Sequence, residues 1–433
     1  LLTSSDDKRL LADAGMPEAY DEFIASPLSD LRAARTAIDV AYVSHIDRDH
    51  IGGILRLLDH EVEWRAYEHS QANGGRLRKP KAPRPPEIRQ FWHNAFLEDI
   101  GRTETVDLGT ALTASAGVLS GLNAAALGDR DARAAIETAQ MLALSVGDAI
   151  EVNWRIGTDQ LDIPLNPAFG GKLMTARPLQ PIPLGTFSIT VLGPTAQQLR
   201  ELRKDWIKWL ERSTDTLESL RKRHQRDADA ISAGANALDL ASLSRDIALA
   251  VEKDVTPPNL ASLVLLVEEG NTRMLLTGDA GDESLLDYLK AAKLLDASGK
   301  IEVDVLKVPH HGAHNSYSKT FVESVRARHL IFCGDGKHDN PEPEVVKGYI
   351  DAIKAAPLSD GRNTTFWFNW SSARGGEFLD HWNTVEGLFD NAAAQAGIVR
   401  RSLRKTEASM TLDLKLGANH SGGKFHHVTT DRC

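Results

Sequence analysis

The alternation of hydrophobic and polar residues predicts short strands that end in clusters of metal-binding side chains. The segment IDVAYV at residues 38–43 is apolar and rich in β-branched residues, which is typical of a strand. SHIDRDH follows it directly, and the apolar sequence ILRLLDH after Gly52 and Gly53 indicates a helix. The pattern therefore predicts a strand, then a loop rich in potential ligands, then a helix.

A second, β-rich region is predicted between residues 260 and 350. LASLVLLVEE and RMLLTGDA, separated by a turn at Gly270 and Asn271, form a predicted hairpin. IEVDVLKVPHHGAHNS predicts a further strand that ends in histidines, and RHLIFCGDGKHDNPEPEVV predicts another. Neighbouring strands of one sheet place their carboxyl ends at one edge, so we expect these distant residues to converge there.

Between these regions the pattern changes, which indicates an insertion. Residues 74–89, GGRLRKPKAPRPPEIR, are rich in glycine, proline and basic residues and predict a loop. An Ala-rich stretch, DARAAIETAQMLALSV, predicts a helix further on. The tail GANHSGGKFHH is expected to be mobile. We divide the chain into a main domain of residues 1–60 and 181–355, an insertion of residues 61–180 with a basic loop and then helices, and a C-terminal segment of residues 356–433.

The composition is typical of a globular protein and limits the classes to which it can belong. Of 433 residues, 42% are hydrophobic and 25% charged, and the net charge is −10. This charge argues against an extensive basic surface for nucleic acid, but it permits a local basic groove. No apolar run reaches the about 20 residues of a membrane span, so no membrane association is expected.

The cysteines and the start of the chain indicate the cellular setting. Cys333 and Cys433 are the only cysteines and cannot form a disulfide framework, so a reducing, cytoplasmic location is expected. The first residues, LLTSSDDKRLL, contain neither an initiator methionine nor a signal-peptide pattern. We expect that upstream residues are missing from this sequence.

The segment SHIDRDHIGG places four potential metal ligands within six consecutive positions, namely His45, Asp47, Asp49 and His50. Side chains of this kind repel or desolvate one another at such spacing unless a metal binds them. A loop can divide the set between two ions, whereas one tetrahedral zinc held by all four would leave no position for water. A purely structural role is rare for such a loop, so we expect metal binding.

Two other strand ends add candidate ligands. Asp279 ends the strand LLTGDA, where its carboxylate could bridge two ions, and His310 or His311 would complete the second ion. Each of these motifs alone is a common strand-to-turn signal without function. Together with the ligand loop they predict one shared dinuclear site.

In this order, SHIDRDHIGG, LLTGDA and LKVPHHG resemble the metallo-β-lactamase fold, and most closely the hydrolase domain of the DNA-uptake channel ComEC and its soluble relatives. The resemblance covers residues 1–60 and 185–350. It implies an α/β fold, an αββα sandwich that here carries a helix-rich insertion. It also implies two divalent metal ions in a cleft at the sheet edge. We expect Zn²⁺ or Mn²⁺, with Mg²⁺ as a further candidate.

The resemblance implies roles for the individual ligands. It assigns His45 and Asp47 to one ion and Asp49 and His50 to the other. Asp279 would bridge the two ions, and the histidine pair would supply a further ligand.

The resemblance also extends to two residues outside the ligand loop, and it has gaps. Asp13 matches an acid that steadies the ligand loop, and GDGKHDNPEPE matches a late loop that brings His338 to the rim. The early hairpin of the family is largely absent, and Asp47 stands where a histidine is usual. No obvious histidine matches the usual third ligand, and Asn259 occupies that region. The insertion has no counterpart, and the chain lacks a membrane channel.

The predicted chemistry is hydrolysis by metal-bound hydroxide. Two divalent ions lower the pKa of a bridging water to about 7, and the hydroxide then attacks an ester, amide or phosphodiester. We assign catalytic roles to Asp49, Lys307 and His338. Lys307 could hold a phosphate oxygen or be an ordinary solvated lysine. His338 could protonate the leaving oxygen or be unrelated to the chemistry.

Three classes of function follow. The first is a nuclease or phosphodiesterase, favoured by the resemblance and by the basic loop. The second is a hydrolase of a small-molecule ester, lactone, thioester or amide. The third is a protein with a vestigial metal site that binds a partner through residues 61–180. For the first class, we expect the loop to lie over the cleft and bind phosphates of nucleic acid. The alternative is a solvated loop. Its basic residues are Arg76, Arg78, Lys79, Lys81 and Arg84.

Overall fold

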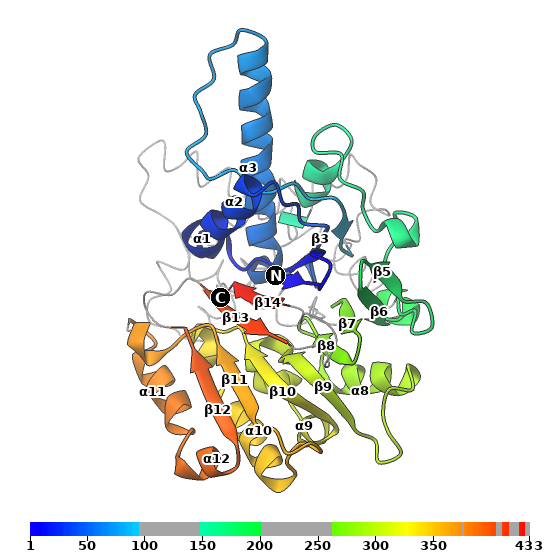
Figure 1. Cartoon of the computed structure of the whole chain (residues 1–433), viewed down its shortest axis with the longest axis vertical. Helices are drawn as coiled ribbons and strands as arrows, with labels where there is room; N and C mark the ends of the chain where they lie inside the picture. The colour runs from blue at the N-terminus through cyan, green and yellow to red at the C-terminus, as the bar shows by residue number, and fades with distance from the viewer. Residues whose placement is uncertain are drawn as a thin grey trace, which may run out of the picture.

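The chain has a mixed α/β architecture, as predicted, with two sheets and helices packed against them (Figure 1). The predicted helix DARAAIETAQMLALSV and Asn259 lie outside the residues that the structure describes. Residues 151–156, later in the predicted insertion, are helical. The computed structural model describes residues 1–94, 148–149, 151–200, 262–374, 376–403, 409–414 and 424–428.

The smaller sheet has six strands in the order β13-β14-β1-β2-β3-β4. Strands β2, β3 and β4 are parallel, so their carboxyl ends lie at one edge. The tail expected to be mobile forms β14 over part of its length, because its backbone pairs with both β1 and β13. The strands are β1 Leu2–Thr3, β2 Arg9–Ala12, β3 Val40–Tyr42, β4 Phe91–Trp92, β13 Ser409–Asp413 and β14 Lys424–Val428.

The larger sheet has eight strands in the order β12-β11-β10-β9-β8-β7-β6-β5. The predicted hairpin is present as the antiparallel pair β7 and β8, and β8 to β12 run parallel. Strands β11 and β12 come from the predicted C-terminal segment, which is therefore part of this sheet. The strands are β5 Ile182–Leu184, β6 Phe187–Gly193, β7 Val264–Glu269, β8 Thr272–Leu276, β9 Ile301–Lys307, β10 Val325–Phe332, β11 Thr364–Phe368 and β12 Ile398–Ser402.

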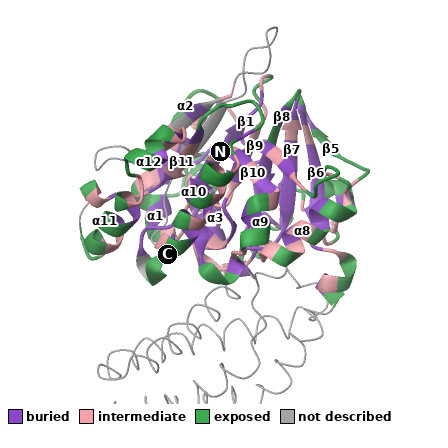
Figure 2. Ribbon diagram, turned by 90° about the horizontal axis from the view of Figure 1, so that it is seen from below, coloured by how far each residue is buried: buried purple, intermediate pink, exposed green. Residues whose placement is uncertain are grey.

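Three hydrophobic cores separate the layers. Strand β3 is buried on both faces: Val40 and Tyr42 face the larger sheet, and Ala41 and Val43 pack with α1, α2 and α3. A third core joins the larger sheet to α8, α9, α10 and α11. The strands are mostly buried, while the helices expose their outer faces (Figure 2). The helices are α1 Pro17–Ala19, α2 Ala25–Ala33, α3 Arg48–Ala72, α8 Asp282–Ala291, α9 Lys319–Ser324, α10 Pro343–Ala355, α11 Leu379–Gly387 and α12 Asn391–Gln395.

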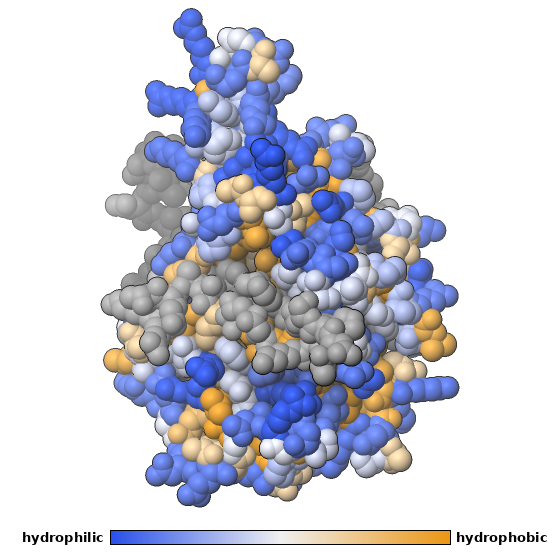
Figure 3. Space-filling view, in the orientation of Figure 1, coloured by the Kyte–Doolittle hydropathy of each residue, from blue (hydrophilic) through white to orange (hydrophobic). Residues whose placement is uncertain are grey.

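Helix α3 begins earlier than the sequence pattern predicts. It starts at Arg48, with Asp47 at the N-cap and Asp49 in the first turn, so half of the expected ligand loop is helical. An acidic residue in the first turn interacts favourably with the helix dipole. The helix also continues past the predicted domain boundary at residue 60. Its far end projects from the rest of the molecule and is mostly hydrophilic (Figures 1 and 3).

No helix among the described residues is both long and apolar enough to cross a membrane.

Candidate metal centre

The carboxyl ends of strands from both sheets meet at one site. Asp13 directly follows β2, His45 lies three residues after β3, and Asp279 lies three residues after β8. His310 and His311 lie in the turn Pro309–Gly312, just after β9, and have left-handed backbone conformations. The structure thus brings together side chains that are more than 200 residues apart in sequence.

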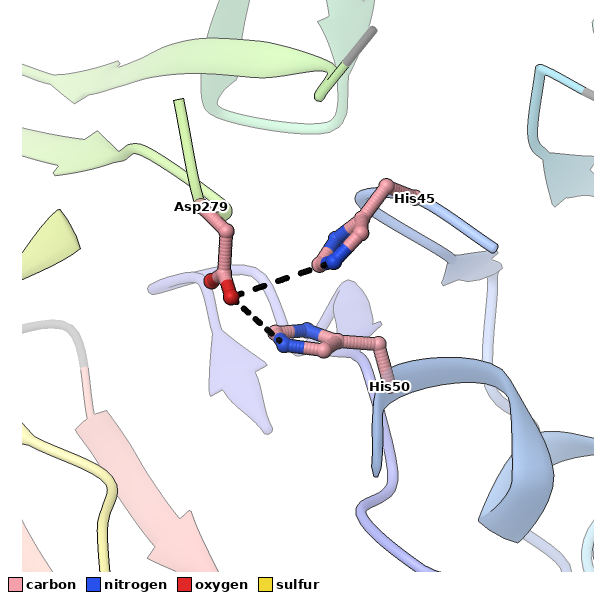
Figure 4. Close-up of side chains that lie close together, drawn as sticks. All are labelled: His45, His50 and Asp279. Carbon is pink, nitrogen blue, oxygen red and sulfur yellow. Dashed lines mark ion pairs between the residues drawn. The ribbon is translucent and has the colours of Figure 1, made fainter. Parts of the chain in front are cut away.

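Three imidazoles converge on one carboxylate oxygen, Oδ2 of Asp279. The Nε2 atoms of His45, His50 and His311 lie 3.8, 3.4 and 3.3 Å from it (Figure 4 shows the first two). His45 Nε2 also lies 3.4 Å from Oδ2 of Asp47. Oδ2 of Asp279 is therefore shared by the three imidazoles, and His45, His50 and Asp279 form one group that could hold an ion.

Asp49, His50 and His311 form a second group suited to a metal ion. Asp49 Oδ2 lies 2.9 Å from His311 Nε2 and 3.5 Å from His50 Nε2. Metal–ligand distances of 2.0–2.2 Å in tetrahedral geometry place ligand atoms about 3.4 Å apart, close to these separations. The Nε2 atoms of His50 and His311 lie 3.1 Å apart, which is unfavourable unless a proton or a cation lies between them.

A further observation fits a metal. Nε2 of His45 is buried and has no hydrogen-bond partner among the described residues. A buried polar atom without a partner costs free energy unless a ligand satisfies it. Three imidazoles and three carboxylates also form a suitable donor set for Zn²⁺ or Mn²⁺.

Groups behind the ligands fix their orientation. Asp13 accepts hydrogen bonds from the backbone N–H and the hydroxyl of Ser44, at 2.7 and 2.8 Å, and its Oδ2 lies 2.9 Å from His50 Nδ1. His311 Nδ1 lies 2.8 Å from the carbonyl oxygen of Cys333. Contacts of this kind direct Nε2 toward the ligand cluster. Asp13 thus has the contacts that its predicted role, steadying the ligand loop, requires.

The structure distinguishes the two neighbouring histidines. The His311 side chain is 4% exposed and its Nε2 lies within the second group. The His310 side chain is 21% exposed, its Nε2 lies 3.9 Å from Asp279, and its Nδ1 faces the hydroxyl of Ser316. His311 is therefore the better candidate for a direct ligand.

Without metal, the charges within the cluster shift the pKa values of its members in the direction opposite to the effect of burial. Burial acts to raise the pKa of Asp279, but Lys307, His50 and His311 lower this pKa well below its usual range. Burial acts to lower the pKa of His311, but Asp279 and Asp49 raise it to about 10. In the metal-free cluster His311 thus retains a proton, which a metal must displace on binding.

Lys307 faces the cluster from the end of β9. Its ammonium donates hydrogen bonds to Oδ1 of Asp279 at 3.0 Å and to the carbonyl of Gly278 at 2.7 Å. Lys307 therefore positions and neutralises the Asp279 carboxylate. Its predicted contact with a phosphate oxygen stays a prediction.

His338 is placed differently from the ligands. It lies in the turn Lys337–Asp339 after β10, on the exposed surface and outside both ligand groups. Its predicted role as a proton donor stays a prediction.

The basic loop does not lie over the cluster, contrary to the sequence-based expectation. It packs along the far part of α3: the backbone N–H of Leu77 donates to the hydroxyl of Ser70, and the indole of Trp64 donates to the carbonyl of Ala82. Ser70 is twenty residues beyond His50, which corresponds to about 30 Å along the helix. Arg84 forms ion pairs with Glu61 and Glu68. The other four basic residues, Arg76, Arg78, Lys79 and Lys81, are exposed.

One buried histidine beside the cluster was not predicted from the sequence. His93 directly follows β4, is 1% exposed, and has no hydrogen-bond partner for either ring nitrogen among the described residues. Burial lowers its pKa to about 4, with smaller effects from Asp13 and His45. The signal in the sequence is a short apolar pair, FW, followed at once by a histidine.

No protein-family model matches this chain, and no curated protein shows significant similarity to it. By its fold and site, the chain is an α/β protein with a buried cluster of histidines and aspartates at a sheet edge, and this cluster could hold a metal ion.

Proposed function

We propose that this protein is a dinuclear metal-dependent hydrolase of the metallo-β-lactamase type that cleaves phosphodiesters, with nucleic acid as its substrate. The observation that carries the proposal is the convergence of three imidazoles on Oδ2 of Asp279. The order of layers, helices, sheet, sheet and helices, supports the αββα sandwich that the sequence resemblance implies.

In this proposal, His45 and Asp47 would hold one ion, Asp49, His50 and His311 would hold the other, and Asp279 would contribute to both. Bound metal ions of this kind supply a hydroxide nucleophile at neutral pH and stabilise negative charge on the reacting oxygens.

The chain's own residues orient and screen this chemistry. Asp13 fixes the ring of His50, and the Cys333 carbonyl fixes the ring of His311. Lys307 offsets the charge of Asp279 and holds its Oδ1, which leaves Oδ2 directed at the three imidazoles. Since the ligands are largely buried, electrostatic interactions within the site are stronger than they would be in water.

Metal-loaded protein, incubated with plasmid DNA, single-stranded DNA, RNA and bis-(p-nitrophenyl) phosphate, tests the proposal. We expect hydrolysis of the small phosphodiester and of at least one nucleic acid. Asp49→Ala and His50→Ala should abolish it, lose at least one ion per chain, and leave the circular dichroism spectrum unchanged. His69→Ala, an exposed histidine at the far end of the same helix, is the control and should retain activity.

Each other outcome selects an alternative. Full activity in both ligand variants would refute the site assignment. If the parent cleaves lactones or thioesters but no phosphodiester with any metal, it is a small-molecule hydrolase. If it binds no metal and cleaves nothing, the cluster is vestigial and a role in partner binding takes its place.

A further inference from the structure

The two proposed ions have unequal ligand sets among the described residues. The ion assigned to Asp49, His50 and His311 also has Asp279, which gives four protein ligands. Among the described residues, the ion assigned to His45 and Asp47 has only Asp279 in addition, which gives three protein ligands. The Asp47 side chain is also 31% exposed. A tetrahedral site with three protein ligands binds its ion less tightly than a complete one can.

His93 is a further buried histidine, on the strand next to the one that leads to His45. Strand β4 pairs in parallel with β3, with Trp92 opposite Tyr42, so His93 follows directly beside the segment that leads to His45. The backbone N–H of Val43 donates to the carbonyl of Trp92 at 2.9 Å. Three adjacent parallel strands, β2, β3 and β4, thus lead into Asp13, His45 and His93.

The backbone around His93 is held in place by two buried asparagines. The side-chain amide of Asn166 accepts from the N–H of His93 at 2.9 Å and donates to its carbonyl at 2.6 Å. The amide of Asn94 makes the same pair of bonds with the backbone of Met174, at 2.7 and 2.8 Å. Four buried hydrogen bonds therefore fix this position, although the imidazole itself has no partner among the described residues.

An imidazole buried without partners is destabilising unless something binds it. If the His93 ring served only to fill the core, an apolar side chain could replace it without loss of stability. A neutral imidazole is the form that binds metal ions. Nε2 of His45 likewise has no hydrogen-bond partner among the described residues.

We propose that the imidazole of His93 is a further ligand of the ion assigned to His45 and Asp47. This inference rests on the proposed metal centre. It makes β4, a strand of two residues within the predicted insertion, part of the site.

The test uses His93→Phe, which keeps an aromatic ring but removes both nitrogens, with His60→Phe as the matched control. His60 is also buried but lies outside both ligand groups, beside Tyr20 and Asp21. Metal content, cobalt absorption spectra and thermal unfolding are measured with and without metal. We expect His93→Phe without metal to be as stable as the parent or more so, because unsatisfied groups are gone.

With metal, we expect His93→Phe to bind one of two ions at least about 10-fold more weakly and to change the cobalt spectrum. Metal addition should raise the melting temperature of His93→Phe by less than it raises that of the parent. His60→Phe should keep both ions and the full gain. His93→Gln, which preserves polarity, should show the same loss and serves if the phenylalanine variant does not fold.

The failures are distinguishable. If both His93 variants keep two ions and the parent spectrum, His93 is a structural residue and this inference falls while the metal centre stands. If the parent itself binds no metal, the metal centre and this inference fall together.

Discussion

Next to Asp279, the surroundings of two adjacent histidine side chains decide which of them is placed to bind a metal ion. His310 and His311 are adjacent, yet only His311 combines burial, an Nε2 inside the cluster and an Nδ1 oriented by a carbonyl. The two residues adopt left-handed backbone conformations, with φ of 46° and 55°, which turn their side chains to different surroundings. This difference leads to the first prediction.

His311→Ala should lose one metal ion per chain and reduce hydrolysis by about 100-fold or more, since losing a ligand costs more than losing the group behind it. His310→Ala should retain both ions and most of the activity. Elemental analysis after dialysis and rates with bis-(p-nitrophenyl) phosphate measure both effects. If His310→Ala loses the ion and His311→Ala keeps it, the ligand assignment is reversed.

The second prediction concerns metal identity. Three carboxylates, Asp47, Asp49 and Asp279, share the cluster with three imidazoles. Oxygen ligands favour harder ions than an all-histidine site does. We therefore expect Mn²⁺ to restore activity to chelator-stripped protein at least as well as Zn²⁺. Restoration by zinc alone would contradict this expectation.

At the scale of elements, the start of α3 must dock closely for the site to form. A Cβ atom on Gly53 would lie 2.0 Å from the carbonyl oxygen of Ala14, next to Asp13. The N–H of Gly53 also donates to the carbonyl of Gly15 at 2.7 Å. The helix that carries Asp49 and His50 is therefore held directly against the segment that carries Asp13.

Gly53→Ala should destabilise the protein by about 1–3 kcal/mol, because a backbone atom cannot move aside as a flexible side chain can. It should also weaken metal binding, since the shift separates His50 from Asp13. Gly387→Ala is the control: apart from the backbone of its own helix and its chain neighbours, no atom lies within 4 Å of a Cβ added to this exposed helical glycine. There the change should be neutral or stabilising by up to about 1 kcal/mol. Denaturant midpoints compare the two, and equal effects would refute the docking argument.

The sequence predicted those elements whose apolar runs end abruptly in a ligand. Strands β3, β8 and β9 have this pattern, and their ends do meet. The start of α3 was predicted too late because Asp47 and Asp49 were interpreted only as ligands, although an N-cap and a first-turn acid are also helix signals. His93 was missed because β4 has only two residues, too few for any periodicity. The choice between His310 and His311 depends on tertiary contacts that no local pattern contains.

At the scale of the whole molecule, the site depends on both sheets. Asp13, His45 and His50 come from the side of the smaller sheet, and Asp279 and His311 from the larger one. The core between the sheets thus holds the two halves of the cluster together. The basic loop lies outside this arrangement, at the projecting end of α3, and any role in binding must act over a distance.

That distance makes the last prediction specific to substrate length. The exposed basic residues lie beside a part of α3 about 30 Å from His50, which corresponds to about nine base pairs of duplex at 3.4 Å each. A polynucleotide at the cluster can reach the loop only if it is longer than this. Arg84 is excluded from the test because its ion pairs with Glu61 and Glu68 hold the loop to the helix. The variant neutralises Arg76, Arg78, Lys79 and Lys81 with glutamine.

We expect this variant to cleave bis-(p-nitrophenyl) phosphate and very short duplexes as the parent does, but longer duplexes more slowly at low salt. Each lost phosphate contact should reduce the slope of log affinity against log salt by about 0.9, so the two proteins should converge at high salt. A control replaces exposed lysines at α8 and α9, far from the projecting helix, and should match the parent (Figure 1). Its positions are Lys290, Lys293 and Lys319. If the four-residue variant binds and cuts long nucleic acid with the parent's salt dependence, the loop is a solvated surface and the substrate is recognised at the metal cluster alone.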